Sequence, residues 1–343
     1  MLPPCVPPVE AEPTELTYGV FGLIVSTNRS IPGLEANRLR GGSVRPRTDV
    51  HLVVHDVPAW VREASERGPE PFYVSAVRGP SGAPALLARA LDRGVLFQVR
   101  HWDGTECFID RTGERLWLSW PADGVDDPYE FLLGHVMGFV LRLRGSLCLH
   151  AAAVAGRGGG VLAIAGRPGV GKSTLVAALA SRGYPVLTDD VAAVMRDADG
   201  SFVLHPGPAR LRPRRAGLTA LAASSPAVHW VASPLPDCVD IDLSQPGLTH
   251  AREAGRLQRV CFLESRPNCV AAELGPISHV DAVIALSSDT WARRLQSRQM
   301  QQQEFQEMGR LLTAVLPIRA TYSPGSDWIA ALIPHLACVL DTL

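Results

Sequence analysis

The segment Gly-Arg-Pro-Gly-Val-Gly-Lys-Ser at 166–173 constrains the fold of this chain more than any other part of the sequence. It matches the pattern G-x-x-x-x-G-K-[ST] at every position. The apolar run Val161–Ala165 precedes it, and a helix-favouring segment follows from Ser173 to Arg182 and meets a stop signal at Gly183. A glycine-rich turn between a buried strand and a helix aims its backbone N–H groups and the helix N-terminus at one anion. The sequence therefore predicts an α/β fold with a phosphate-binding loop after a central strand.

The loop contains the only lysine of the chain, Lys172, although Lys and Arg together number 33. Arginine serves as well as lysine on a surface, but a compact ammonium suits a position where it must reach a phosphate. We expect Lys172 to bridge the β- and γ-phosphates of ATP and the Ser173 hydroxyl to bind Mg²⁺. The alternative is a glycine-rich turn with an incidental lysine, which leaves the flanking strand and helix signals unexplained. The other residues expected to contact the nucleotide are Gly166, Pro168, Gly169, Val170, Gly171 and Thr174.

Two adjacent aspartates, Asp189 and Asp190, follow a second short strand signal at 185–187. In open α/β sheets, functional residues lie beyond the carboxyl ends of the strands, which is where this pair is expected. One carboxylate could hold Mg²⁺ beside Ser173, and the other could accept a proton from an attacking hydroxyl. Two neighbouring carboxylates also resist simultaneous ionisation, which raises one pKa. A helix N-cap with a solvated neighbour is the structural alternative.

The order of these features resembles the kinase domain of HPr kinase/phosphorylase, a P-loop fold related to phosphoenolpyruvate carboxykinase. The chain reads LHAAAVAGRGGGVLAIAGRPGVGKSTL, which begins just before His150, and then YPVLTDDVAAV. It is similar also to a divergent branch found in peptide-modification clusters, some members of which phosphorylate a lasso-peptide precursor on serine. The likeness covers about residues 130–343. The glutamate-arginine-glycine signature that follows the aspartates in the bifunctional enzymes is not found here, which leaves phosphorylase activity and the acceptor open.

The resemblance implies that one of Asp189 and Asp190 is the catalytic base and the other a metal ligand. We assign the metal to Asp189 with Ser173, and catalytic roles to both aspartates, Lys172 and His150, whose imidazole would tune the charge of the aspartate. A core histidine with satisfied hydrogen bonds is the alternative for His150. The expected function is an ATP-dependent kinase that transfers the γ-phosphoryl group to a hydroxyl, a serine of a peptide or protein. A nucleotide-dependent regulatory or binding NTPase and a small-molecule kinase are the alternatives.

A basic run, GPARLRPRRAGL, follows at 207–218. Its arginines, with Arg210 and Arg212 as the first candidates, could clamp a substrate carboxylate or complete the γ-phosphate site. A solvated loop is the alternative. The run is short and carries no interleaved aromatic residues, and the net charge of the chain is −1, so no nucleic-acid partner is expected.

Three segments make up the expected organisation. Residues 1–13 are proline-rich and are expected to be disordered, residues 14–126 to form a β-rich N-terminal domain, and residues 127–343 to form the P-loop domain of the HPr kinase/phosphoenolpyruvate carboxykinase type. The N-terminal domain carries no catalytic motif, but its aromatic-rich meander could offer an edge strand to an extended peptide. Its expected strands are 18–26, 49–55, 95–102, 106–110 and 115–120, with a short helix at 84–92.

The P-loop domain is expected to begin with a buried helix at 127–144 and to continue with alternating strands and helices. Residues 222–250 are rich in Pro, Ser and Asp and are expected to be a mobile insertion. The other expected strands are 147–155, 201–205, 259–263, 269–274 and 318–322, and the other helices are 280–286, 289–316 and 327–340.

Composition limits the location and the partners. Seven cysteines are scattered without a CxxC pair, which favours buried thiols in a reducing compartment. No signal peptide is visible, and the longest apolar stretch, 131–140, is too short to span a bilayer. We therefore expect a cytoplasmic protein without a membrane partner. A homo-oligomer is possible.

Overall fold

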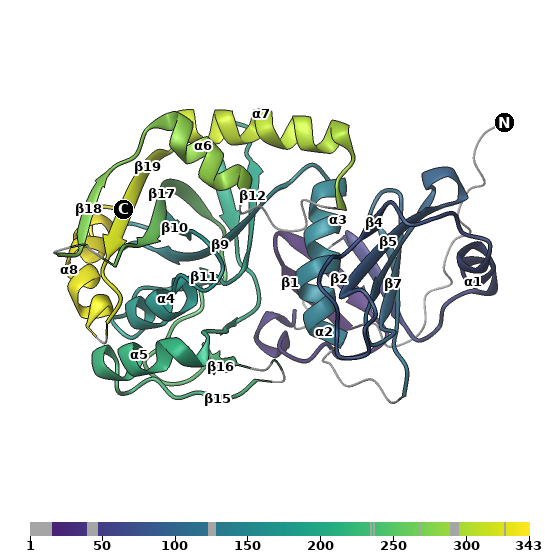
Figure 1. The fold of residues 1–343 in the computed structure, drawn as a ribbon, viewed down its shortest axis with the longest axis horizontal. Coiled ribbons are helices and arrows are strands. Elements are labelled where there is room, and N and C mark those ends of the chain that lie inside the picture. The colour runs from purple at the N-terminus through teal and green to yellow at the C-terminus, as the bar shows by residue number, and fades with distance from the viewer. Residues whose placement is uncertain are drawn as a thin grey trace. The chain divides into compact units, whose positions relative to one another are not determined.

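The computed structural model describes residues 16–39, 47–122, 128–233, 235, 237–267, 269, 271–288, 295–325 and 327–343. The chain forms two compact units, Met1–Gly145 and Ser146–Leu343, and each combines β-sheet with α-helices (Figure 1). The N-terminal residues 1–13, expected to be disordered, lie outside the described residues. Among those described, no helix has the length and apolar character needed to cross a membrane.

The described residues of the first unit form one eight-stranded mixed sheet, in the order β1-β2-β3-β8-β7-β6-β5-β4. Strands β2 and β3, and β3 and β8, run parallel, and the other neighbours run antiparallel. The strands are β1 (Leu16–Val20), β2 (Leu23–Thr27), β3 (Val50–Val54), β4 (Tyr73–Val74), β5 (Leu86–Leu91), β6 (Leu96–His101), β7 (Glu106–Asp110) and β8 (Arg115–Ser119).

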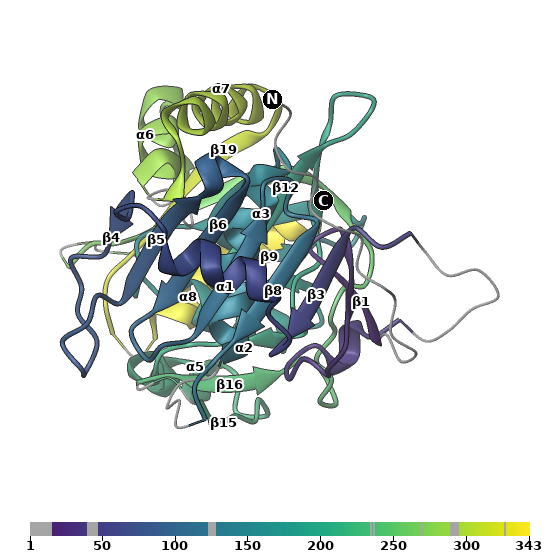
Figure 2. The same ribbon diagram turned by 90° about the vertical axis from the view of Figure 1, so that its right-hand side faces the viewer.

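Helices cover both faces of this sheet (Figure 2). Helix α1 (Ala59–Glu66) packs Val61 and Ala64 into a cluster that includes Phe108 and Trp117. On the other face lies a continuous helical segment made of α2 (Pro128–Phe131), a π-helical turn (Leu132–Val136) and α3 (Met137–Leu143). There the rings of Phe97 and Phe139 pack edge to face, with 5.1 Å between their centroids.

Three expectations for this unit differ from the structure. The segment expected as a helix at 84–92 is strand β5, because its alternating buried side chains pair in register with β6. The run expected as one strand at 18–26 is a hairpin that turns at Phe21 and Gly22, both with positive φ. Helix α1 was not among the expected elements. The helix expected at 127–144 belongs to the first unit rather than the second, because its apolar face packs on the sheet of that unit.

In the second unit eight of the described strands form one sheet in the order β10-β9-β12-β13-β17-β19-β18, with β11 paired to β9 and β10 also paired to β17. The strands are β9 (Leu147–Ala155), β10 (Val161–Ala165), β11 (Val186–Thr188), β12 (Val191–Arg196), β13 (Phe202–His205), β17 (Gly255–Ser265), β18 (Glu273–Pro276) and β19 (Leu316–Tyr322). Strands β10, β17 and β19 are parallel, so their carboxyl ends lie at one edge.

Helices α4 (Lys172–Ala180) and α5 (Leu218–Ser224) lie on one side of this sheet, and α6 (His279–Ser288) and α7 (Arg298–Ala314) on the other (Figure 1). The α6–α7 side is closed by a cluster that joins Leu149, Ala151 and Ala153 of β9 to Leu286 and Leu311. Nearly every residue of α4 is buried, as expected for a helix that is apolar on all sides. Helix α8 (Trp328–Leu340) closes the described chain.

The segment expected as a mobile insertion at 222–250 contains regular structure instead. It includes the end of α5 and two strands, β15 (Val231–Ala232) and β16 (Val239–Asp242), which join β14 (Arg210–Leu211) in a small sheet. Strand β16 buries Val239 and Ile241 completely, and this burial accounts for its order. Residues 234 and 236 lie outside the described part.

Candidate functional site

Strand β9 brings the loop at 166–173, called the glycine loop below, next to the two aspartates. Strand β10, which leads into the glycine loop, pairs with one edge of β9 and ends with Ala165 opposite Ala151. Strands β11 and β12 pair end to end with the other edge of β9, and the two aspartates connect them. Side chains alternate along a strand, and those of residues 149, 151 and 153 face α6 and α7, so His150 faces the side of α4. The loop, the aspartates and the histidine therefore meet.

The glycine loop needs its glycines for both conformation and space. Gly166 has φ 147° and Gly171 has φ 100°, which other residues rarely adopt. A Cβ on Gly166 would lie 2.6 Å from the carbonyl oxygen of Leu263, and one on Gly171 would lie 2.9 Å from the Trp328 ring. Gly171 is also the N-cap of α4 and has no side chain to accept from the N–H groups of the first turn. These N–H groups and the helix dipole are therefore directed at whatever binds in the loop.

Lys172 lies inside the loop rather than on the surface. Its side chain is buried, and its Nζ donates to the carbonyl oxygen of Gly166 over 2.8 Å. The neighbouring segment 167–169 is exposed. The lone ammonium is thus held at the centre of a loop whose rim is open to a ligand.

Two aromatic residues from the end of the chain brace the loop. The Tyr322 hydroxyl donates to the carbonyl oxygen of Val170 over 2.6 Å, and its ring stacks on Trp328 with 4.3 Å between centroids. Tyr322 ends β19, whose carboxyl end lies at the same edge of the sheet as the loop. Both aromatic side chains are largely buried, so they support the loop backbone instead of forming a stacking platform in solvent.

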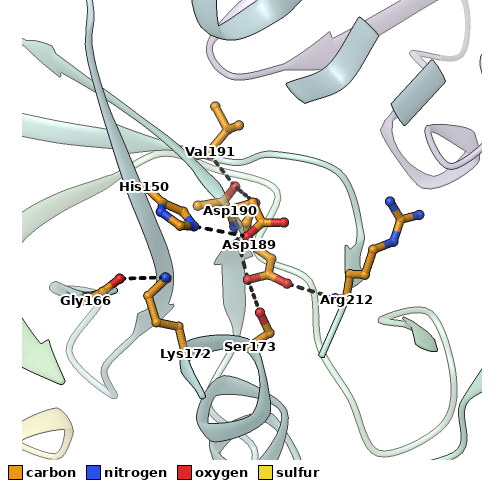
Figure 3. Close-up of polar contacts among 9 residues, drawn as sticks. His150, Gly166, Lys172, Ser173, Asp189, Asp190, Val191 and Arg212 are labelled. Atoms are coloured by element: carbon orange, nitrogen blue, oxygen red, sulfur yellow. Dashed lines mark hydrogen bonds and ion pairs between the residues drawn. The ribbon is translucent and has the colours of Figure 1, made fainter. Parts of the chain in front are cut away.

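Asp189 is the centre of the hydrogen bonds shown in Figure 3. Its Oδ1 accepts from the Ser173 hydroxyl over 2.9 Å and from the backbone N–H of Asp190 over 3.1 Å. Its Oδ2 accepts from the backbone N–H of Arg212 over 2.8 Å. One carboxylate therefore ties the start of α4 to the segment that carries the arginines.

Asp190 has an unusual backbone that turns its side chain toward His150. Its φ is 62°, and the Val191 N–H donates to the Asp189 carbonyl over 2.7 Å, so these three residues form a tight turn. The turn is held by the Thr188 hydroxyl, which donates to the Val191 carbonyl over 2.7 Å. His150 Nε2 lies 3.6 Å from Asp190 Oδ1. Non-glycine residues in such conformations are concentrated at functional sites.

The environments of the two carboxyl groups differ. Burial, followed by the charge of Asp190, raises the pKa of Asp189 to about 7, although the bonds from Arg212 and Ser173 and the charge of Lys172 oppose this. Burial also disfavours ionisation of Asp190, but the interaction with His150 and the charges of Lys172 and Arg212 outweigh it, so the pKa of Asp190 is lowered. The pKa values of the two neighbouring carboxyl groups are therefore shifted in opposite directions, and Asp190 is the one that ionises more readily.

The candidate substrate arginines have different surroundings. The Arg212 side chain is buried and donates to Asp240 through two bonds of 2.6 and 3.2 Å, and in Figure 3 it points away from the aspartates. Arg210 lies in β14, where its backbone pairs with Asp242 of β16. The guanidinium of Arg212 is therefore used inside the fold, while its backbone N–H serves Asp189.

The available donors fit Mg²⁺ better than a softer metal. Within the described ranges, no group of three or more His, Cys, Asp or Glu residues is arranged to hold a metal. Ser173 and Asp189 provide one hydroxyl and one carboxylate in hydrogen-bond contact. Mg²⁺ is usually held by one or two such oxygens, with water and substrate phosphates completing its octahedral shell. Ser173 and Asp189 are thus the residues that could hold it.

Sequence reasoning did not single out Tyr322, Trp328 or Asp240. Tyr322 could have been found, because it ends a strand expected to be in the sheet and strand ends of parallel neighbours meet at the site. Trp328 and Asp240 carry no comparable signal. Trp328 lies against Tyr322 and Gly171, and Asp240 is bonded to Arg212.

No protein-family model matches the chain, and no curated protein is similar enough in sequence to match. Among solved structures it is similar to the Hpr(Ser) kinase/phosphatase from Coxiella burnetii. The identity is 13% and the TM-score 0.27, over 57% of this chain and 92% of that chain.

Proposed function

We propose that this chain is an ATP-dependent kinase that transfers the γ-phosphoryl group to a hydroxyl, a serine of a peptide or protein. The observation that supports this most strongly is the hydrogen bond between Ser173, at the start of α4, and Asp189, with the Asp190–His150 pair beside it. A phosphate-binding loop alone would serve any nucleotide-binding protein. An ionised carboxylate held beside that loop adds a group that can accept the proton of an attacking hydroxyl.

The chain's own residues divide the work as follows. The N–H groups of the glycine loop and the start of α4 bind the phosphates, and Lys172 donates to the β- and γ-phosphate oxygens. A bound Mg²⁺, held by Ser173 and Asp189, would neutralise phosphate charge. The aromatic pair Tyr322 and Trp328 keeps the loop in its binding conformation. Positioning and charge neutralisation account for most of the catalysis in this class of reaction.

These groups account for each bond and proton in the transfer step. The acceptor oxygen attacks the γ-phosphorus, its proton passes to an oxygen of Asp190, and the bond from the γ-phosphorus to the β–γ bridging oxygen breaks. ADP leaves with that electron pair. His150, 3.6 Å from Asp190 Oδ1, keeps the carboxylate oriented and favours its ionised form.

The test uses γ-labelled ATP, Mg²⁺ and a library of peptides that share a central serine, with the full chain as enzyme. Label on serine supports the proposal. Label released only as phosphate at the same rate without peptide indicates the regulatory NTPase, and label on an added small alcohol but on no peptide indicates the small-molecule kinase. A chain that binds no nucleotide would refute all three.

Two variants assign the roles. Lys172→Ala is expected to lose ATP binding, and Asp190→Asn to keep ATP binding but lose about 10²- to 10⁴-fold in transfer rate, the usual contribution of a general base. Asp199→Asn is the matched control, because Asp199 is exposed in the turn between β12 and β13. An Asp190→Asn protein as active as the control would remove Asp190 from the mechanism.

A further inference from the structure

The turn that follows Arg212 lies against the glycine loop and the first turn of α4. A Cβ placed on Gly217 would lie 2.5 Å from Thr174 Oγ1, so this turn packs on α4 next to Ser173. A Cβ placed on Gly169, in the exposed part of the loop, would have Arg214 Nε as its nearest contact, at 4.0 Å. The Arg214 guanidinium therefore lies beside the middle of the loop.

The backbone around Arg214 is held in place by hydrogen bonds. The backbone N–H of Val239 donates to the Pro213 carbonyl oxygen over 3.1 Å, and the backbone N–H of Arg215 donates to the Asp237 carbonyl oxygen over 2.7 Å. Gly217 donates to the carbonyl of Arg214 itself over 2.9 Å. Arg214 is thus presented to the loop by a fixed segment, and only its side chain has to move to reach a ligand.

The side chain of Arg214 is exposed. As far as the described residues go, its guanidinium makes no hydrogen bond or ion pair with the protein. Arg212, two residues earlier on the same segment, is buried and bonded twice to Asp240. The same basic run therefore holds one arginine that the fold uses and one that is available to a ligand.

A nucleotide in the glycine loop would have its inner phosphates surrounded by backbone N–H groups and its β- and γ-phosphates reached by Lys172. During transfer, negative charge is spread over the three equatorial oxygens of the γ-phosphoryl group, and a guanidinium can donate to two of them at once. We propose that Arg214 is this donor, a catalytic arginine supplied by the same chain that contacts the γ-phosphoryl group both in bound ATP and in the transition state. This inference rests on the kinase function proposed above.

In the step itself, Arg214 forms and breaks no covalent bond. The acceptor oxygen bonds to the γ-phosphorus as the bond to the bridging oxygen breaks, and the acceptor proton goes to Asp190. Arg214 keeps its own protons and donates hydrogen bonds to the transferring oxygens throughout, which lowers the barrier by stabilising their charge.

The decisive measurement compares ATP with ADP, because only ATP carries the group that Arg214 contacts. In Arg214→Ala the dissociation constant of ATP with Mg²⁺ is expected to rise about 10- to 100-fold, as for the loss of a charged hydrogen bond. That of ADP is expected to change by less than about twofold, within the scatter of a surface charge change. The transfer rate at saturating ATP should fall about 10³-fold or more, as for other arginines in this role. Arg214→Lys should recover the affinity in part but not the rate, because an ammonium cannot donate in a fork.

Arg215→Ala is the matched control, since Arg215 is also exposed and its loss changes the net charge equally. An equal loss of ATP affinity in Arg215→Ala, or an equal weakening of ATP and ADP in Arg214→Ala, would overturn the assignment to the γ-phosphoryl group. If wild-type protein binds no ATP, the proposed function itself is wrong. If Arg214→Ala transfers phosphate like wild type, the kinase proposal stands and only the arginine is misassigned. If Arg214→Ala melts at a lower temperature than wild type, the test is made with Arg214→Lys instead. A weaker affinity for ATP than for ADP relative to wild type, together with a lost transfer rate, then supports the assignment, and an equal change for both nucleotides overturns it.

Discussion

The pair formed by Arg212 and Asp240 should be one of the most sensitive positions for the stability of the second unit. The two side chains are 6% and 19% exposed, and two hydrogen bonds join them. Asp240→Ala removes the carboxylate and leaves the guanidinium buried without its partner. Breaking a buried pair in this way costs about 3–5 kcal/mol, and the partial exposure of Asp240 indicates the lower end of that range.

The expected loss of about 3 kcal/mol is measured by urea unfolding, followed by circular dichroism. Arg266→Ala is the control, because Arg266 forms an ion pair of similar length, 2.9 Å, with Glu264 while both side chains are nearly half exposed. A screened pair of that kind contributes about 0–1 kcal/mol, so the control should unfold close to wild type.

A double variant separates the lost bond from the stranded charge. Arg212→Met with Asp240→Leu removes both charges and should recover most of the stability, because an apolar pair of similar volume needs no desolvated partner. It should also bind ATP within a few-fold of wild type, since the bond to Asp189 comes from the backbone N–H of residue 212. A loss below about 1 kcal/mol in Asp240→Ala, or a double variant no more stable than the single one, would refute this reasoning.

Three further predictions follow from named contacts. Amine-directed labelling should modify Lys172 as the only lysine side chain, and ATP with Mg²⁺ should protect it; mass spectrometry that finds unchanged labelling at saturating nucleotide would contradict the proposed phosphate site. Gly171→Ala should lose ATP binding and more stability than Gly247→Ala, because both have positive φ but only the first would bring a Cβ within 2.9 Å of the Trp328 ring; equal effects in calorimetry would exclude that clash as the cause. Burial, then the charge of His101, lowers the pKa of His135 to about 4, so the unfolded chain binds the proton more tightly and stability falls as the pH drops from about 6.5 to about 4. Over that window His135 accounts for about 3 kcal/mol, and His135→Gln should remove this part of the pH dependence of urea unfolding; an unchanged slope would show that His135 does not carry it.

Continuous or alternating apolar runs were sufficient to predict many elements of the fold. Strands β3, β6 to β10 and β19 and helices α4, α6 and α8 lie within a few residues of their expected positions. The segment 84–92 was misassigned because Leu, Ala and Arg favour a helix locally, whereas pairing with β6 and burial of Leu86 and Leu91 stabilise a strand. Strand β12 was missed because paired aspartates usually follow the end of a strand. Here they form a turn between β11 and β12, and both of these strands pair with the same edge of β9.

The candidate site likewise contains residues that the sequence could predict and residues that it could not. The glycine loop was predictable because all its parts are adjacent in the chain, and the meeting of Ser173 with Asp189 followed from where strand ends lie in such sheets. Of the supporting residues, Tyr322 was signalled only by its place at the end of an expected strand, and Trp328 and Asp240 carried no signal because each reaches the site through a contact between distant segments. Their positions depend on register and crossing of strands, which no local pattern encodes.

The sequence alone determined that a loop with a lone lysine stands between a buried strand and a helix, because only neighbouring residues are needed to define it. Among the arginines at 210–215 it favoured Arg210 and Arg212 as ligand contacts, but nothing in one short run of the same residue type could show which side chain is buried. The tertiary structure decided between them. The small sheet containing β16 places Asp240 beneath Arg212, and the fixed turn at 213–217 leaves Arg214 exposed beside Gly169. Burial and pairing are properties of the surroundings of a side chain, so only the folded chain could assign one arginine to structure and offer the other to a ligand.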